Sequence, residues 1–170
     1  MPTVAIIRSL LAYTLWGDRV VLRALEAVEE EDLHREAGAS FNSVLGTMAH
    51  ILGAERLWLS RFVGDPLGAL PGLEDYPDLV ALQGGFEDFR PQAEFFLASL
   101  TETMLAGDLH YTNTQGAEHS LTLWQALTHL SHHSSYHRGQ VITLLRQMGY
   151  EPPSTDLLQF FLERNRVPLT

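Results

Sequence analysis

Histidine is the residue type that this sequence gathers in one place. The chain has eight histidines and no cysteine, and four of the histidines (His129, His132, His133 and His137) fall within nine residues. Neutral imidazole is a common ligand of zinc, nickel and other transition metals. The cluster therefore predicts a metal site with nitrogen ligands, whereas the lack of cysteine excludes a cysteine-containing zinc site and a thiol nucleophile from the protein itself.

The spacing of these histidines limits which of them can share one ion. Residues four apart on a helix face nearly the same way and lie about 6 Å apart along the axis. Two pairs meet this condition, His129 with His133 and His133 with His137. All three cannot bind one ion from a straight helix, because the outer two lie about 12 Å apart and metal–nitrogen bonds are about 2.0–2.1 Å long. Spacing leaves both pairs open, and His132 points about 100° away, toward the surface or behind a ligand.

A pair of imidazoles needs a further ligand from another helix, and His50 is the best candidate. It lies among Met48, Ile51 and Leu52, where an unpaired polar ring would be unfavourable. Three imidazoles would leave one coordination position open for water or a substrate. Because imidazole must be neutral to coordinate, we expect the metal to be lost below about pH 6.

Other polar residues near these histidines have less specific roles. Neither histidine pair has the general-base glutamate of the His-Glu-x-x-His metalloproteases, because Leu130 and Ser134 follow the first histidine of each pair. Asp18 lies on or near an apolar stripe, so we expect it to pair with an arginine or to orient a ligand histidine. Glu55 follows His50 by five residues, and we expect it on a different face, in an i, i+3 interaction or an exposed ion pair.

Four segments with a helical spacing of apolar residues must position these side chains. Ser40 or Asn42 is the expected N-cap of the second segment, and Thr122 with Gln125 forms a capping-box pattern at the start of the fourth. We expect helices over about residues 4–28, 42–63, 86–104 and 122–148, and a short final segment over 156–163.

The connections between these segments differ in length. Residues 64–85 are rich in glycine and proline and have no sustained period, and we expect them to cross the domain from end to end rather than to cover a site. Residues 108–120 are polar with a turn signal at Gly116, which allows a short irregular hairpin. The pattern predicts an all-α fold in which residues 1–170 form one domain, a four-helix bundle with one long crossover connection.

Composition narrows the class of function. Hydrophobic residues make up 45% of the chain and charged residues 19%, as in ordinary globular proteins. The net charge of −10 would repel a phosphate backbone, so we expect no nucleic-acid partner. Arg8 interrupts the apolar stretch near the N-terminus, and we expect no membrane partner and a cytoplasmic location. Trp16, Trp58 and Trp124 are expected in the core or at a dimer interface.

Two segments of the chain carry a family resemblance. Residues 129–140, with the sequence HLSHHSSYHRGQ, resemble the histidine signature of the DinB-like, or damage-inducible, metalloprotein family. Residues 49–58 look like the second signature of that family, and residues 13–19 and 149–158 fit its two ends. The resemblance covers nearly the whole chain and implies a DinB-like four-helix bundle that is often a homodimer.

The resemblance also implies a site and a chemistry. Its metal ligands correspond to His50, His133 and His137, which would hold a divalent transition metal such as zinc or nickel. Proteins with a similar fold are transferases or isomerases that use a low-molecular-weight thiol, for example bacillithiol or mycothiol. The implied function is a metal-dependent thiol S-transferase that acts on a small-molecule thiol and an electrophile. The alternatives are a non-catalytic, stress-induced metal-binding protein and a metal-assisted hydrolase.

Overall fold

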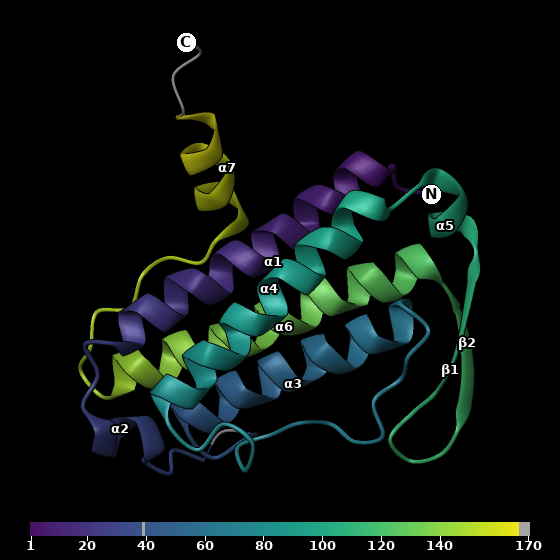
Figure 1. The fold of residues 1–170 in the computed structure, drawn as a ribbon. Coiled ribbons are helices and arrows are strands. Elements are labelled where there is room, and N and C mark those ends of the chain that lie inside the picture. Colours follow the sequence, from purple (N-terminus) through teal and green to yellow (C-terminus); the bar gives the residue numbers. More distant parts are fainter. Residues whose placement is uncertain (39, 167–170) are drawn as a thin grey trace.

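Four long helices lie side by side as a bundle in the computed structural model, which describes residues 1–38 and 40–166 (Figure 1). The end of the predicted domain, residues 167–170, lies outside the described residues. Short elements join or follow the long helices, and α7 projects from the bundle. The elements are α1 (Val4–Leu25), α2 (Glu30–His34), α3 (Val44–Phe62), α4 (Leu79–Ser99), α5 (Glu102–Ala106), β1 (Asp108–Thr112), β2 (Glu118–Thr122), α6 (Leu123–Gln147) and α7 (Leu157–Asn165).

The long connection exists because α3 and α4 run in the same direction. Arg56 in α3 donates to the Gly85 carbonyl at 2.7 Å, and Phe62 at the end of α3 stacks on Phe96 near the end of α4. Parallel neighbours require a connection that returns along the bundle. Figure 1 shows this connection running beside α3. The predicted crossover is confirmed, and Gly53 permits its close approach, since a β-carbon there would lie 1.9 Å from the Pro71 carbonyl oxygen.

The boundaries of α4 differ most from those expected. This helix begins at Leu79, seven residues before the expected start, because the Asp78 side chain accepts a hydrogen bond from Ala81 N and caps it. Gly85 lies inside the helix and does not break it. A glycine is needed there for packing, because a β-carbon would lie 2.6 Å from the Tyr76 ring. The helix ends at Ser99 rather than near residue 104, since residue 100 is extended and a separate capped turn, α5, follows.

Smaller differences occur at other helix ends. The first helix ends at Leu25, and part of the acidic run after it forms the short helix α2. The N-cap of α3 is Ser43, whose hydroxyl accepts from Gly46 N, and neither of the two expected residues. The capping box of Thr122 and Gln125 at the start of α6 is present. Before it, β1 and β2 pair antiparallel, so a regular hairpin is present where the sequence allowed a short irregular one.

An apolar core extends along the whole bundle. Ile7 and Leu25 near the two ends of α1 are both buried, as are Leu127 and Leu145 in α6. Trp58 is buried in the core, which is one of the two locations expected for the tryptophans. Within residues 1–38 and 40–166, no helix combines the length and apolar character needed to cross a bilayer.

Candidate metal centre

Three histidines from two helices meet at one point in the structure. His50 comes from α3, and His133 and His137 come from one face of α6. Each offers a ring nitrogen, and these nitrogens all lie within 4.8 Å of one another. The ring centroids are 5.0 Å apart for His50 and His133, 4.7 Å for His50 and His137, and 4.5 Å for His133 and His137. The group is the one that the resemblance implied, and it could hold a divalent metal.

The distances within the group suit a small transition-metal ion. His50 Nε2 and His133 Nε2 are 3.2 Å apart. Two nitrogens bound tetrahedrally at about 2.0–2.1 Å from one ion lie about 3.3 Å from each other. The donor set of three imidazoles is also one that zinc and nickel accept. The residues present therefore fit such an ion without a large rearrangement.

The third histidine is held in the orientation that a metal ligand needs. His137 Nδ1 lies 2.8 Å from Gln140 Oε1, and this contact is a hydrogen bond when Nδ1 carries the proton. The Nε2 atom is then unprotonated and free to bind a metal. Gln140 Nε2 in turn donates to Ser40 Oγ at 3.4 Å, so the loop before α3 helps to fix this glutamine.

The same loop covers one side of the site with an aromatic ring. Phe41 stacks on His50, with centroids 3.7 Å apart and planes at 15°, and meets His137 edge-on at 5.3 Å. Gly46 makes this approach possible, since a β-carbon at this residue would lie 2.3 Å from the Phe41 carbonyl oxygen. Phe41 therefore shields His50 and His137 from water on this side and restricts the rotation of the His50 ring.

Burial keeps two of the three histidines neutral. Desolvation, with a smaller contribution from the neighbouring imidazoles, lowers the pKa of His50 and of His133 from 6.5 to about 4. Both rings are thus uncharged at neutral pH, as coordination requires. Competition by protons at these rings begins at a lower pH than the value near 6 expected for free imidazole. Among the described residues, His133 Nδ1 has no hydrogen-bond partner.

The other two histidines of the cluster lie outside the group. His129 is exposed, and its ring packs 5.3 Å from Trp58 and 5.8 Å from His133. Its pair with His133 is therefore not the one that meets His50. His132 is exposed on α6, at the surface position that its direction on the helix predicted.

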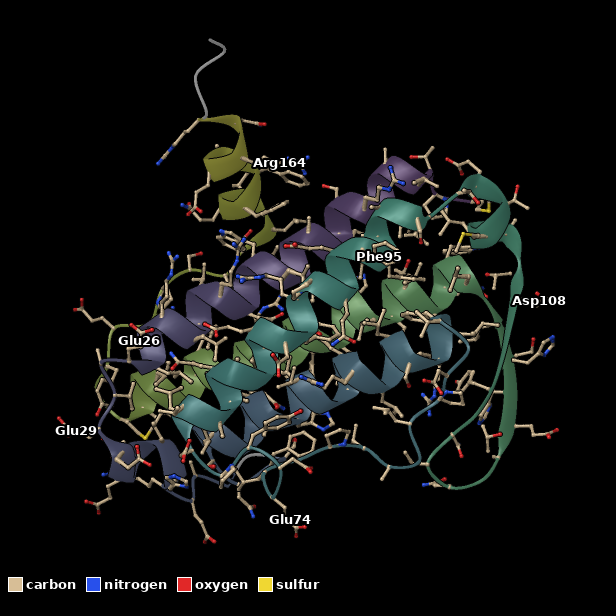
Figure 2. The ribbon with its side chains drawn as sticks, in the orientation of Figure 1. Glu26, Glu29, Glu74, Phe95, Asp108 and Arg164 are labelled. Atoms are coloured by element: carbon tan, nitrogen blue, oxygen red, sulfur yellow. The ribbon has the colours of Figure 1, made fainter. Side chains whose placement is uncertain are left out.

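The two acidic residues are both buried, next to the site. Asp18 accepts from Arg138 Nη1 at 3.0 Å, so the expected pairing with an arginine is observed. Glu55 is fully buried and accepts from Ser134 Oγ at 2.6 Å, so the expected exposed ion pair is wrong. The physical reason is the position of α3, which is enclosed by α4, α6 and the crossover and has almost no exposed face near its middle. Figure 2 shows where other charged residues lie: Glu26, Glu29, Glu74, Asp108 and Arg164 are on the outside of the molecule.

Sequence reasoning missed Ser134 and Arg138, although α6 contains a signal for them. A buried stripe runs along this helix with steps of three and four residues, and three of its positions are polar. This interruption of an apolar stripe indicates polar partners on the facing helices. The residues of the stripe are Leu127, Ser131, Ser134, Arg138, Val141 and Leu145.

Comparisons with known proteins identify a family that the chain matches. The model of a family described as the DinB family matches residues 1–166. Among curated proteins, Protein DinB of Bacillus subtilis (strain 168) is 24% identical over 152 residues. The matched region covers 86% of this chain and 88% of that protein.

Proposed function

This chain belongs to the DinB family, and on that basis we propose that it is a metal-dependent thiol S-transferase whose metal ligands are His50, His133 and His137. The metal in this proposal is a divalent ion, zinc or nickel. The thiol substrate in this proposal is a low-molecular-weight thiol such as bacillithiol, and the acceptor is a small electrophile.

The meeting of three imidazoles at one point carries the proposal. Three ligands leave a four-coordinate ion with one position for a molecule from solution. A bound divalent ion would lower the pKa of a thiol in that position and favour the thiolate, which is the nucleophilic form. Because the chain has no cysteine, the sulfur must come from outside.

Several side chains would prepare this site before any thiol arrives. His50 and His133 need no deprotonation at neutral pH, because burial has already lowered their pKa values to about 4. Gln140 holds the His137 ring with Nε2 available, and Phe41 covers the site from one side. The ligands are therefore preorganised, which reduces the entropy lost when an ion binds.

Two measurements on tag-free protein test the proposal. Elemental analysis should find about one divalent transition-metal ion per chain, lost in His50→Ala and kept in the control His110→Ala, which replaces an exposed histidine of β1. The second measurement follows bacillithiol with monochlorobimane, in which a sulfur–carbon bond forms, a carbon–chlorine bond breaks, chloride leaves and buffer takes the thiol proton. A rate above background that requires metal supports the transferase, and its absence contradicts it.

The same variants separate the alternatives. If the ion only stabilises the bundle, removing it should lower the melting temperature strongly. We expect the metal-free fold to persist instead, because the apolar core extends along the whole bundle, beyond the site. Hydrolysis of an activated ester without any thiol would identify the metal-assisted hydrolase.

The proposal also covers the state of the protein in the cell. We propose a homodimer, as the family resemblance implies, with a cytoplasmic location and a role in stress. Light scattering at several concentrations tests the first point, since a mass of one chain at all of them would refute the dimer. Fractionation and expression after DNA damage test the others.

A further inference from the structure

Each ligand on α6 is followed by a residue that is bonded to a buried carboxyl group of another helix. Ser134 follows His133 and donates to Glu55 of α3 at 2.6 Å. Arg138 follows His137 and donates to Asp18 of α1 at 3.0 Å. Ser134 and Arg138 are therefore four residues apart, as His133 and His137 are, and each lies one position further along the helix.

These contacts are enclosed by protein. Arg138 and Glu55 are 0% exposed and Asp18 is 2% exposed. Arg138 packs against Gly17 of α1, where a β-carbon would lie 2.6 Å from Arg138 Nε. The guanidinium also donates to the Thr14 carbonyl at 3.4 Å. The arginine thus occupies a slot whose walls allow it very little movement.

The charges of the network balance when one carboxyl group keeps its proton. Burial raises the pKa of Glu55 well above its ordinary value, and the Asp18 carboxylate raises it further. Among the described residues, Asp18 Oδ2 and Glu55 Oε2 are buried and have no hydrogen-bond partner. A proton on Glu55 makes this group neutral, while Asp18 faces the Arg138 cation as its anion. The interior then holds one cation and one anion rather than an unbalanced charge.

We propose that Ser134 and Arg138 are positioning residues of the metal centre, which set the rotation of α6 about its axis and thereby aim His133 and His137 at His50. The inference rests on the proposed metal site, because it assigns these residues a role toward the three ligands.

The physical reason lies in the directionality of the contacts. Burial of apolar side chains is favourable in many orientations of a helix, because the hydrophobic effect has no preferred direction. Hydrogen bonds to a buried carboxyl group tolerate only a narrow range of distance and angle. Successive residues on a helix point about 100° apart, so fixing the direction of Ser134 and Arg138 also fixes that of the residue before each.

The test compares two variants that each remove a hydrogen bond to a buried carboxyl group, here called tether variants, with a variant that only weakens the core. Arg138→Met removes the guanidinium but keeps much of the apolar volume, and Ser134→Ala removes a single hydroxyl. The control is Leu145→Ala, which opens the core on the same helix at a residue that is 1% exposed. Binding of Co²⁺ is measured by competition with a chelator and by the visible spectrum of the bound ion.

We expect both tether variants to bind Co²⁺ about 10- to 100-fold more weakly and with an altered spectrum, as is usual when residues behind metal ligands are lost. Leu145→Ala should lose thermal stability but keep the spectrum and an affinity within about twofold of the original. If either tether variant folds and binds Co²⁺ as the original protein does, the inference is refuted. Should Arg138→Met fail to fold, Ser134→Ala decides alone.

A second readout does not depend on metal. In the metal-free protein, the rings of His50 and His133 have centroids 5.0 Å apart and should give nuclear Overhauser contacts. We expect these contacts to be lost in Arg138→Met and kept in Leu145→Ala. Their survival in Arg138→Met would overturn the inference. A protein that binds no Co²⁺ but shows the expected pattern of contacts would refute the proposed function alone.

Discussion

Replacement of Gly17 by alanine tests how tightly the buried arginine is held. Gly17 lies inside α1, where alanine normally stabilises a helix by about 1 kcal/mol relative to glycine. A β-carbon there would lie 2.6 Å from Arg138 Nε and 2.7 Å from Arg138 Cζ. These distances are well below van der Waals contact, and because the arginine is fully buried and bonded to Asp18, any shift of its guanidinium would disturb that contact.

The expected loss of stability combines three contributions. Overpacking of a tight interior costs about 1–3 kcal/mol. Displacing the guanidinium from Asp18 removes a charged hydrogen bond worth about 1.5–3 kcal/mol. Subtracting the gain in helix propensity, we expect Gly17→Ala to destabilise the protein by about 1.5–5 kcal/mol. The control is Gly84→Ala in α4, which has no atom within 4 Å of its new β-carbon and should be neutral or stabilising.

The assay is urea unfolding of the metal-free protein, followed by far-ultraviolet circular dichroism at constant pH. A double-mutant cycle with Arg138→Met identifies the source of the effect, because removing the guanidinium should relieve most of the cost of Gly17→Ala. The reasoning is refuted if Gly17→Ala is as stable as Gly84→Ala, or if its cost is the same in the two backgrounds.

Three further predictions follow from the network and the ligands. Asp18→Asn should destabilise the fold by about 3–5 kcal/mol, since it leaves a buried cation without an anion, whereas Glu55→Gln, which replaces a neutral group, should lose no more than about 1 kcal/mol by urea unfolding. The pKa values of His50 and His133 fall from 6.5 to about 4 on folding, so the unfolded state binds more protons between these values, and metal-free stability should fall as pH drops through this range. A smaller fall of stability in metal-free His133→Gln would show that His133 causes part of the effect, and an identical fall would contradict the assignment of the effect to this ring. Gln140→Ala should weaken Co²⁺ binding about tenfold, as measured by chelator competition, and unchanged affinity would show that the hydrogen bond to the ligand ring is dispensable.

Local patterns predicted the parts of the site that depend on spacing within one helix. His133 and His137 are four residues apart on α6, so their shared face follows from helix geometry alone. The capping box at Thr122 is likewise a local interaction and was predicted correctly. The boundaries of α4 were predicted less well, because Gly85 resembles a helix breaker in the sequence and acts as a packing residue in the structure.

The role of Glu55 could not be predicted in the same way. Its charge and its distance from His50 along α3 suggested an exposed position. The burial of a side chain depends on how many neighbours surround its helix, and the middle of α3 is enclosed by two helices and the crossover. Phe41 was missed for a related reason, since only the approach of its loop to Gly46 brings its ring onto His50.

The sequence by itself determined the four long helices, the crossover and the kind of side chain that could bind a metal, because these depend on short-range periodicity and on the chemistry of the side chains. Only the tertiary structure decided which histidines meet and which carboxyl groups are buried beside them. These properties depend on the rotation and the neighbours of each helix, and contacts such as that of Asp18 with Arg138, 120 residues apart in the chain, set them.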